Sequence, residues 1–199
     1  MEHTHLANQL SGRAIGSIFF SFFGVVWLGL AFYIRQALTT GTIIGLASLL
    51  GVLILTALWL FKQSTRWPKA TEDPNRSRAF NRVNAIQWIA VAVIAFSFSK
   101  LHLDAYIMSA ITAVVGIHLF PLAKLFRYPM HNITGAALVL WASATVLLVP
   151  TEILQGITAL GTGSVLLTSA AIAQGLAVRA AMRANAAEAN RTEHLCMER

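Results

Sequence analysis

The side chains best suited to chemistry are a few histidines, asparagines and glutamines that lie within or beside long apolar stretches. Six of them are candidates for a binding site: His118, Gln87, Asn84, His131, Asn132 and Gln174. Imidazole and amide groups both donate and accept hydrogen bonds, and a polar group that has no partner in hydrocarbon costs several kcal/mol. These side chains must therefore pair with one another or bind a polar ligand.

Composition shows why their surroundings are apolar. Of the 199 residues, 56% are hydrophobic and 12% are charged, with a mean hydropathy of +0.64, whereas soluble domains have roughly 45–50% and about 25%. A bilayer core takes about 20 apolar residues per helix, and six stretches fit: 14–34, 42–61, 83–99, 103–120, 132–149 and 156–178. The sequence predicts an all-α, polytopic integral membrane bundle of six transmembrane helices in three antiparallel hairpins, which excludes a soluble enzyme.

The basic residues predict the orientation, because loops rich in Lys and Arg stay in the cytoplasm. The two tails and the loops after the second and fourth spans carry 13 of the 15 Lys and Arg residues, and only Arg35 and Lys100 lie on the other side. We therefore expect a multi-pass protein with cytoplasmic N- and C-termini. Its parts are an N-terminal tail (1–13), a transmembrane domain (14–178) and a C-terminal helix or tail (179–199).

The six candidate residues are predicted to share one depth near the cytoplasmic face. Asn84 and Gln87 lie on one face of the third span, which enters from the cytoplasm, and His118 lies three residues before Pro121, which we expect to end the fourth span. The others lie at the matching ends of the fifth and sixth spans: His131, Asn132 and Gln174.

Two interpretations of this polar layer stay open. In one, its side chains form interhelical hydrogen bonds that fix the packing, at about 0.6 kcal/mol each. In the other, they line a cytoplasm-facing vestibule for a small polar solute or a lipid headgroup, with Arg82, Lys124 and Arg127 at its mouth.

Part of the chain resembles a known pattern. The run from Gly116 to Arg127, followed by Tyr128, Pro129 and a helix containing Gly135, resembles small six-helix bacterial inner-membrane proteins. The resemblance covers about a quarter of the chain. It implies a location in a bacterial inner (plasma) membrane and implies nothing about activity.

Three functions remain in order of preference. A small permease or carrier for a small polar solute or lipid comes first, a structural or regulatory interaction protein without transport second, and a membrane-embedded enzyme third, because no nucleophile and base are recognisable. No cofactor and no metal are expected. The expected partners are the bilayer, anionic lipid headgroups on the cytoplasmic side and a second copy through the helices rich in small residues. Nucleic acid is not expected, because the basic excess is what topology demands.

Overall fold

The computed structural model describes residues 2–65 and 74–197, with side chains described for residue 10 and for 12–65 and 75–186. These residues form six long α-helices, one short 3-10 turn and no strand: α1 (Glu2–Ile34), α2 (Thr40–Ser64), α3 (Pro74–Lys100), η1 (Asp104–Tyr106), α4 (Ile107–Phe126), α5 (Met130–Leu148) and α6 (Thr151–Met197). Each α-helix contains a segment long and apolar enough to cross a membrane. The predicted fold class, an all-α membrane bundle with six spans, is confirmed.

The helix ends differ from the sequence prediction in α3 and α4. Helix α3 begins at Pro74, where the fixed φ of proline suits the first turn of a helix. Pro121 does not end the fourth span, as the sequence led us to expect, because α4 continues through it to Phe126. The missing N–H of Pro121 costs one hydrogen bond, and the flanking apolar turns continue the helix despite this loss.

Two pairs of helices make the most extensive contacts in the bundle, namely α1 with α6 and α4 with α5. Facing glycines make both crossings close. A Cβ atom at Gly163 would lie 2.8 Å from the Gly24 carbonyl oxygen, and one at Gly135 would lie 2.6 Å from the Gly116 carbonyl oxygen. Such close backbone approach is how helices gain packing contacts in lipid, where no hydrophobic effect drives them together.

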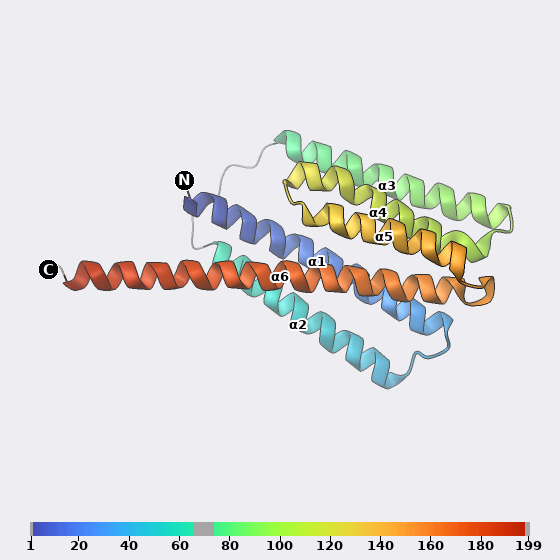
Figure 1. Cartoon of the computed structure of the whole chain (residues 1–199), viewed down its shortest axis with the longest axis horizontal. Helices are drawn as coiled ribbons and strands as arrows, with labels where there is room; N and C mark the ends of the chain where they lie inside the picture. The colour runs from blue at the N-terminus through green and yellow to red at the C-terminus, as the bar shows by residue number, and fades with distance from the viewer. Residues whose placement is uncertain (1, 66–73, 198–199) are drawn as a thin grey trace.

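Helix α6 is the axis of the arrangement. Figure 1 shows α3, α4 and α5 above it, α2 below it, and α1 crossing it. Its 47 residues span about 70 Å at 1.5 Å per residue, more than twice the thickness of a bilayer core. One end of α6 therefore projects well beyond the other helices (Figure 1). Because the largest contacts join helices from different predicted hairpins, the three-hairpin grouping stays a prediction.

Candidate polar site at the basic end of the bundle

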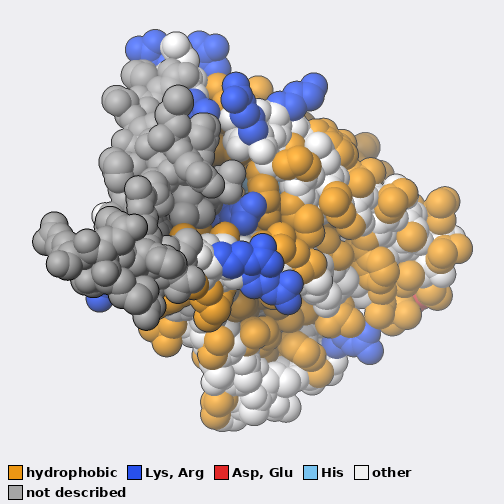
Figure 2. All heavy atoms as spheres, turned by 60° about the vertical axis from the view of Figure 1, so that its left-hand side comes forward, with side chains coloured by type: hydrophobic (Ala, Val, Ile, Leu, Met, Phe, Trp, Pro, Cys, Tyr) orange, Lys and Arg blue, Asp and Glu red, His pale blue; other side chains and the backbone are white. Residues whose placement is uncertain are grey.

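Basic side chains collect at one end of the bundle. Among the described side chains, nine of the eleven Lys and Arg residues lie there: Arg13, Lys62, Arg76, Arg78, Arg82, Lys124, Arg127, Arg179 and Arg183. The described acidic side chains, Asp104 and Glu152, both lie at the opposite end with Arg35 and Lys100. Figure 2, in which the basic end comes forward, shows the cationic side chains beside a broad apolar surface. The described part of this end is thus uniformly positive.

Below this basic surface, two predicted residues come together. His118 on α4 and His131 on α5 are near enough to interact electrostatically, and His118 also hydrogen-bonds to the backbone of Val83 in α3. Helices α4 and α5 are in extensive contact, and the shared membrane depth of the two histidines stays a prediction.

Aromatic rings enclose His131. Its ring centroid lies 5.0 Å from that of Tyr128, 5.5 Å from Phe20 and 6.5 Å from Phe126, all in edge-on arrangements. We call these five residues, His118, His131, Tyr128, Phe20 and Phe126, the imidazole cluster. It joins α1, α4 and α5, so a change at the cluster would alter the packing of three helices.

The local sequence explains how α4 and α5 bring the two histidines together. Arg127 ends α4 in the left-handed conformation, with φ of 50°, and the backbone N–H of Tyr128 donates to the Ala123 carbonyl at 3.0 Å. This C-terminal turn reverses the chain and places Tyr128 three residues before His131. The Gly116–Gly135 crossing then holds the two helices at close range, two residues from His118 and four from His131.

Three polar atoms of the cluster are shielded from solvent and lack a hydrogen-bond partner among the described residues: Nδ1 of His118, Nδ1 of His131 and the hydroxyl of Tyr128. Burial raises the pKa of the Tyr128 phenol, and the nearby Arg13 opposes the shift. The phenol is therefore a neutral donor at physiological pH. The Arg13 guanidinium lies 5.6 Å from the centre of the Tyr128 ring, within the range of a cation–π contact.

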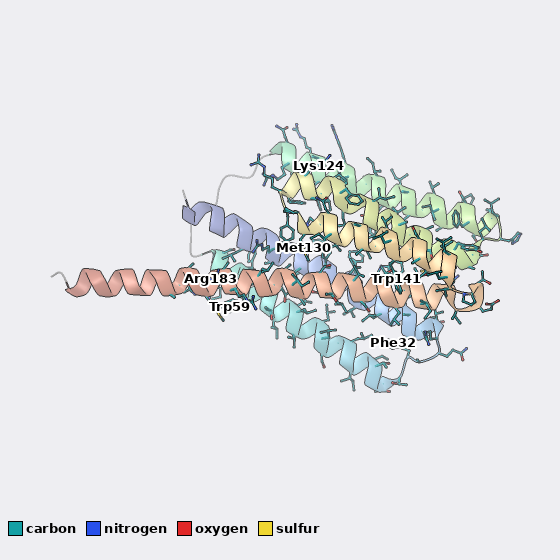
Figure 3. All side chains as sticks on the ribbon, in the orientation of Figure 1. Phe32, Trp59, Lys124, Met130, Trp141 and Arg183 are labelled. Carbon is teal, nitrogen blue, oxygen red and sulfur yellow. The ribbon has the colours of Figure 1, made fainter. Side chains whose placement is uncertain are left out.

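The other predicted residues lie outside the imidazole cluster. Asn84 and Gln87 are half-buried on α3, and Asn132 is exposed at the start of α5. The described residues 75–186 include no hydrogen-bond partner for these three amides. The residues predicted at the mouth of the vestibule, Arg82, Lys124 and Arg127, are all exposed at the basic end; Figure 3 shows Lys124 there, near the end of α4.

Gln174 lies elsewhere. Its side-chain Nε2 donates to Ser17 Oγ at 3.2 Å and to the Leu53 carbonyl at 2.8 Å, so it joins α6 to α1 and α2. Gln174 is five residues beyond Ser169, which turns it about 140° around the helix and away from α5. The sequence predicted only a level for Gln174 in the bundle and could not specify the direction in which its side chain points.

The sequence analysis missed a second polar region, formed by hydroxyl groups. Ser109 Oγ lies 3.0 Å from Thr158 Oγ1, which donates to Thr145 Oγ1 at 3.1 Å. Two further pairs, Thr112 with Thr162 and Thr134 with Ser169, are each 2.9 Å apart. We call these seven residues, Ser109, Thr112, Thr134, Thr145, Thr158, Thr162 and Ser169, the hydroxyl core; all are buried, and they join α4, α5 and α6.

One signal in the sequence could have identified the hydroxyl core. Thr158, Thr162 and Ser169 fall within about 40° of one another around a helix, so α6 presents a row of hydroxyls along one face. The indole of Trp141 on α5 adds a bond from Nε1 to the Thr158 carbonyl at 3.2 Å, and the absence of a side chain at Gly161 leaves room for the ring. These hydroxyls are paired, as packing contacts in a membrane must be.

Two hollows on the described surface are lined by residues outside the imidazole cluster. One, of about 300 Å³, lies between α5 and α6, and the other, of about 380 Å³, lies between α2 and α6. Neither is lined by His118, His131 or Gln87. Among the described residues, no group of three His, Cys, Asp or Glu side chains is placed to hold a metal ion. The cluster is polar, and three of its polar atoms are shielded from solvent and unpaired among the described residues.

Comparisons with protein-family models, with curated proteins and with solved structures give no match. The six apolar helices give this chain the architecture of a multi-pass membrane protein.

Proposed function

We propose that this protein is a membrane carrier for a small anionic solute, and that the imidazole cluster binds the solute together with a proton. The observation that carries the proposal is the set of three shielded polar atoms without partners on His118, His131 and Tyr128. Buried polar groups are nearly always paired, and ionisable groups at membrane depth are functional candidates by default. A transported solute would supply the partner that the described chain does not.

The sign of the surrounding charge supports an anion. Arg13 lies over Tyr128, and every described charged side chain at this end is basic. A positive surface raises the local concentration of anions. If one imidazole takes up a proton as the anion enters, the occupied site carries no added net charge, which lowers the cost of burial. The proton and the anion would leave together on the other side.

The three unpaired atoms are shielded from solvent, so a movement must expose them before solute can bind. The rings of Phe20, Phe126 and Tyr128 surround His131 with edge-on contacts, and side chains of this kind can turn aside without breaking a hydrogen bond. Gly116 and Gly135 have no side chains to interlock, so α4 and α5 can slide along each other at this contact. In the carrier mechanism, opening at this crossing would expose the two imidazoles to water.

A structural or regulatory role is the second candidate, and the packing of the His131 ring against Phe20 and Tyr128 favours it. In that case the site never admits water or solute. The two candidates differ in one measurable property, which is whether the imidazoles ever become accessible from an aqueous phase.

Transport is tested with purified protein in liposomes that enclose a pH-sensitive dye. Gradients of chloride, nitrate, formate and inorganic phosphate are imposed in turn. The carrier hypothesis predicts that at least one anion drives a change in internal pH faster than in protein-free liposomes. His118→Phe and His131→Phe should slow it by about tenfold or more, the effect of losing about 1.4 kcal/mol of interaction with the solute. The matched control is His102→Asn, which removes an exposed imidazole at the opposite end.

Accessibility is tested by cysteine labelling in a Cys196→Ser background, because the chain has a single cysteine. A carrier predicts that His131→Cys reacts with a membrane-impermeant thiol reagent from the basic side, while the buried Leu138→Cys on the same helix does not. If neither position reacts and no anion moves, the protein is not an anion carrier and the structural role is favoured.

A further inference from the structure

The hollow between α5 and α6 has the character of a lipid-facing groove. It has a volume of about 300 Å³ and is mostly apolar, with Met130, Ile133 and Ala137 on α5 and Val165 and Ile172 on α6 among its lining residues. Ile133 and Ile172 are exposed to the surroundings. In a membrane, such a groove lies open to the acyl chains, so it takes an apolar occupant.

Two arginines continue the groove face of α6 toward the basic end. Arg179 and Arg183 are both exposed and follow Ile172 by seven and eleven residues, which places each within about 20° of Ile172 around the helix. Leu176, also exposed, lies between them and the groove. Figure 3 shows Arg183 on α6 beyond the end of α5 at which Met130 lies. The apolar groove therefore leads to a cationic site.

The depths of the groove and the arginines match one lipid leaflet. Leu167 is midway along the predicted span 156–178. From that level Ile172 is about 8 Å and Arg179 about 18 Å toward the basic end, at 1.5 Å per residue. Half of a bilayer core is about 15 Å. The groove thus lies at the depth of the acyl chains and Arg179 at that of the headgroups.

We infer that the α5–α6 groove holds one acyl chain of an anionic phospholipid, whose phosphate is bound by Arg179 and Arg183. Arginine pairs well with phosphate because its planar guanidinium donates two parallel hydrogen bonds. The inference is independent of the proposed transport, because it concerns another surface.

The same arginines argue against a second copy of this chain as the occupant. Two copies inserted in the same direction would hold their Arg179 and Arg183 residues at equal depth. The like charges would repel wherever these two surfaces met. A phospholipid supplies the negative charge that this surface needs.

The inference is tested by the thermal stability of the full-length protein in detergent with added phosphatidylglycerol or phosphatidylcholine. Saturating phosphatidylglycerol should raise Tm by about 5 °C more than phosphatidylcholine, because a ligand that binds only the folded state stabilises it. The double variant R179Q/R183Q should lose this difference. The double variant R78Q/R82Q removes two exposed arginines from α3 at the same end and should keep it. Ala137→Phe, which fills the groove, should reduce it by about half or more.

Several results would overturn the inference. Equal losses in the two arginine variants would mean diffuse attraction to the basic end. If inorganic phosphate alone reproduced the whole shift, the site would bind an anion without an acyl chain. If the protein were a dimer that Ala137→Phe converted to a monomer, the groove would be an interface between copies. An unchanged lipid preference in both R179Q/R183Q and Ala137→Phe would place the lipid elsewhere.

Discussion

The hydroxyl core and the imidazole cluster are both polar regions between apolar helices. They differ in whether their polar atoms have hydrogen-bond partners. In the hydroxyl core, Ser109, Thr145 and Thr158 meet at distances of 3.0 to 3.4 Å. In the imidazole cluster, three shielded polar atoms have no partner among the described residues. The first region therefore stabilises the fold, whereas the second lowers stability, because buried polar groups without partners are costly.

The glycine crossing of α4 and α5 lies beside both regions, so a change there should have the largest effect. Gly116 lies between Thr112 of the hydroxyl core and His118 of the cluster. Gly135→Ala would place a Cβ atom 2.6 Å from the Gly116 carbonyl oxygen, and no rotamer change can relieve a clash with backbone. We expect the free energy of unfolding to fall by about 3 kcal/mol, as measured by titration with denaturing detergent.

The control for this change is Gly51→Ala on α2, where an added Cβ atom meets nothing within 4 Å. That variant should be neutral or slightly more stable, because alanine favours a helix. If the two variants behaved alike, the close crossing would contribute nothing to stability.

The next largest effect should come from the hydroxyl core. Thr158→Val keeps the shape of the side chain but removes the hydroxyl that contacts both Ser109 and Thr145. We expect a loss of about 1.5 kcal/mol in the free energy of unfolding, toward the upper end for hydrogen bonds between membrane helices. Thr56→Val is the matched control, because its hydroxyl contacts only the Val52 carbonyl of its own helix. Equal effects in the two variants would show that the hydroxyl core is not a stabilising contact.

The sequence predicted the six spans because a helix that crosses a bilayer needs about 20 apolar residues, which hydropathy detects. A helix also pairs its own backbone hydrogen-bonding groups, as hydrocarbon requires. The sequence also predicted one depth for His118 and His131, because counting residues along antiparallel helices gives an expected depth, and this depth stays a prediction. Counting does not give the direction in which a side chain points. Gln174 was predicted to lie in the same layer but bonds to α1 and α2, since the neighbours of α6 are set by packing that a single sequence does not specify.

The hydroxyl core was missed for a related reason. Threonine and serine are common in membrane helices and bond readily to their own backbone, as Thr162 does with the Thr158 carbonyl at 2.7 Å. Their types alone therefore do not indicate an interhelical contact. Only the combination of one helix face and a close neighbour identifies them, and that neighbour depends on the small residues at crossings such as Gly116 and Gly135.

A substitution in the imidazole cluster should raise the free energy of unfolding, whereas the substitutions above lower it. His131→Phe replaces an unpaired imidazole by an apolar ring that can keep the edge-on contacts with Phe20 and Tyr128. We expect the free energy of unfolding to rise by about 1 kcal/mol, because the cost of burying an unpaired polar group is removed. Stability should be measured on the protein preparation used for transport, where activity should fall.

The comparison variant is Gln174→Leu, which removes a paired amide at a similar depth and leaves Ser17 and the Leu53 carbonyl without it. It should lower the free energy of unfolding by about 1 kcal/mol. A loss of stability in both variants would show that His131 is a packing residue, and the contrast between the two regions would fail.

The smallest effect concerns the turn that carries Tyr128 into the cluster. Arg127 adopts a left-handed conformation with φ of 50°, which costs a residue with a side chain about 1 to 2 kcal/mol. Arg127→Gly removes this strain. Glycine also loses more conformational entropy on folding, which lowers the stability by about 0.5 to 1 kcal/mol. We expect a net rise in stability of about 0.5 kcal/mol, and the same for His102→Gly, with φ of 55°, at the opposite end.

Glycine also makes the turn more flexible in the folded state, so Arg127→Gly should increase the labelling of His131→Cys and His102→Gly should not. Equal labelling in the two variants would mean that this turn does not control access to the cluster.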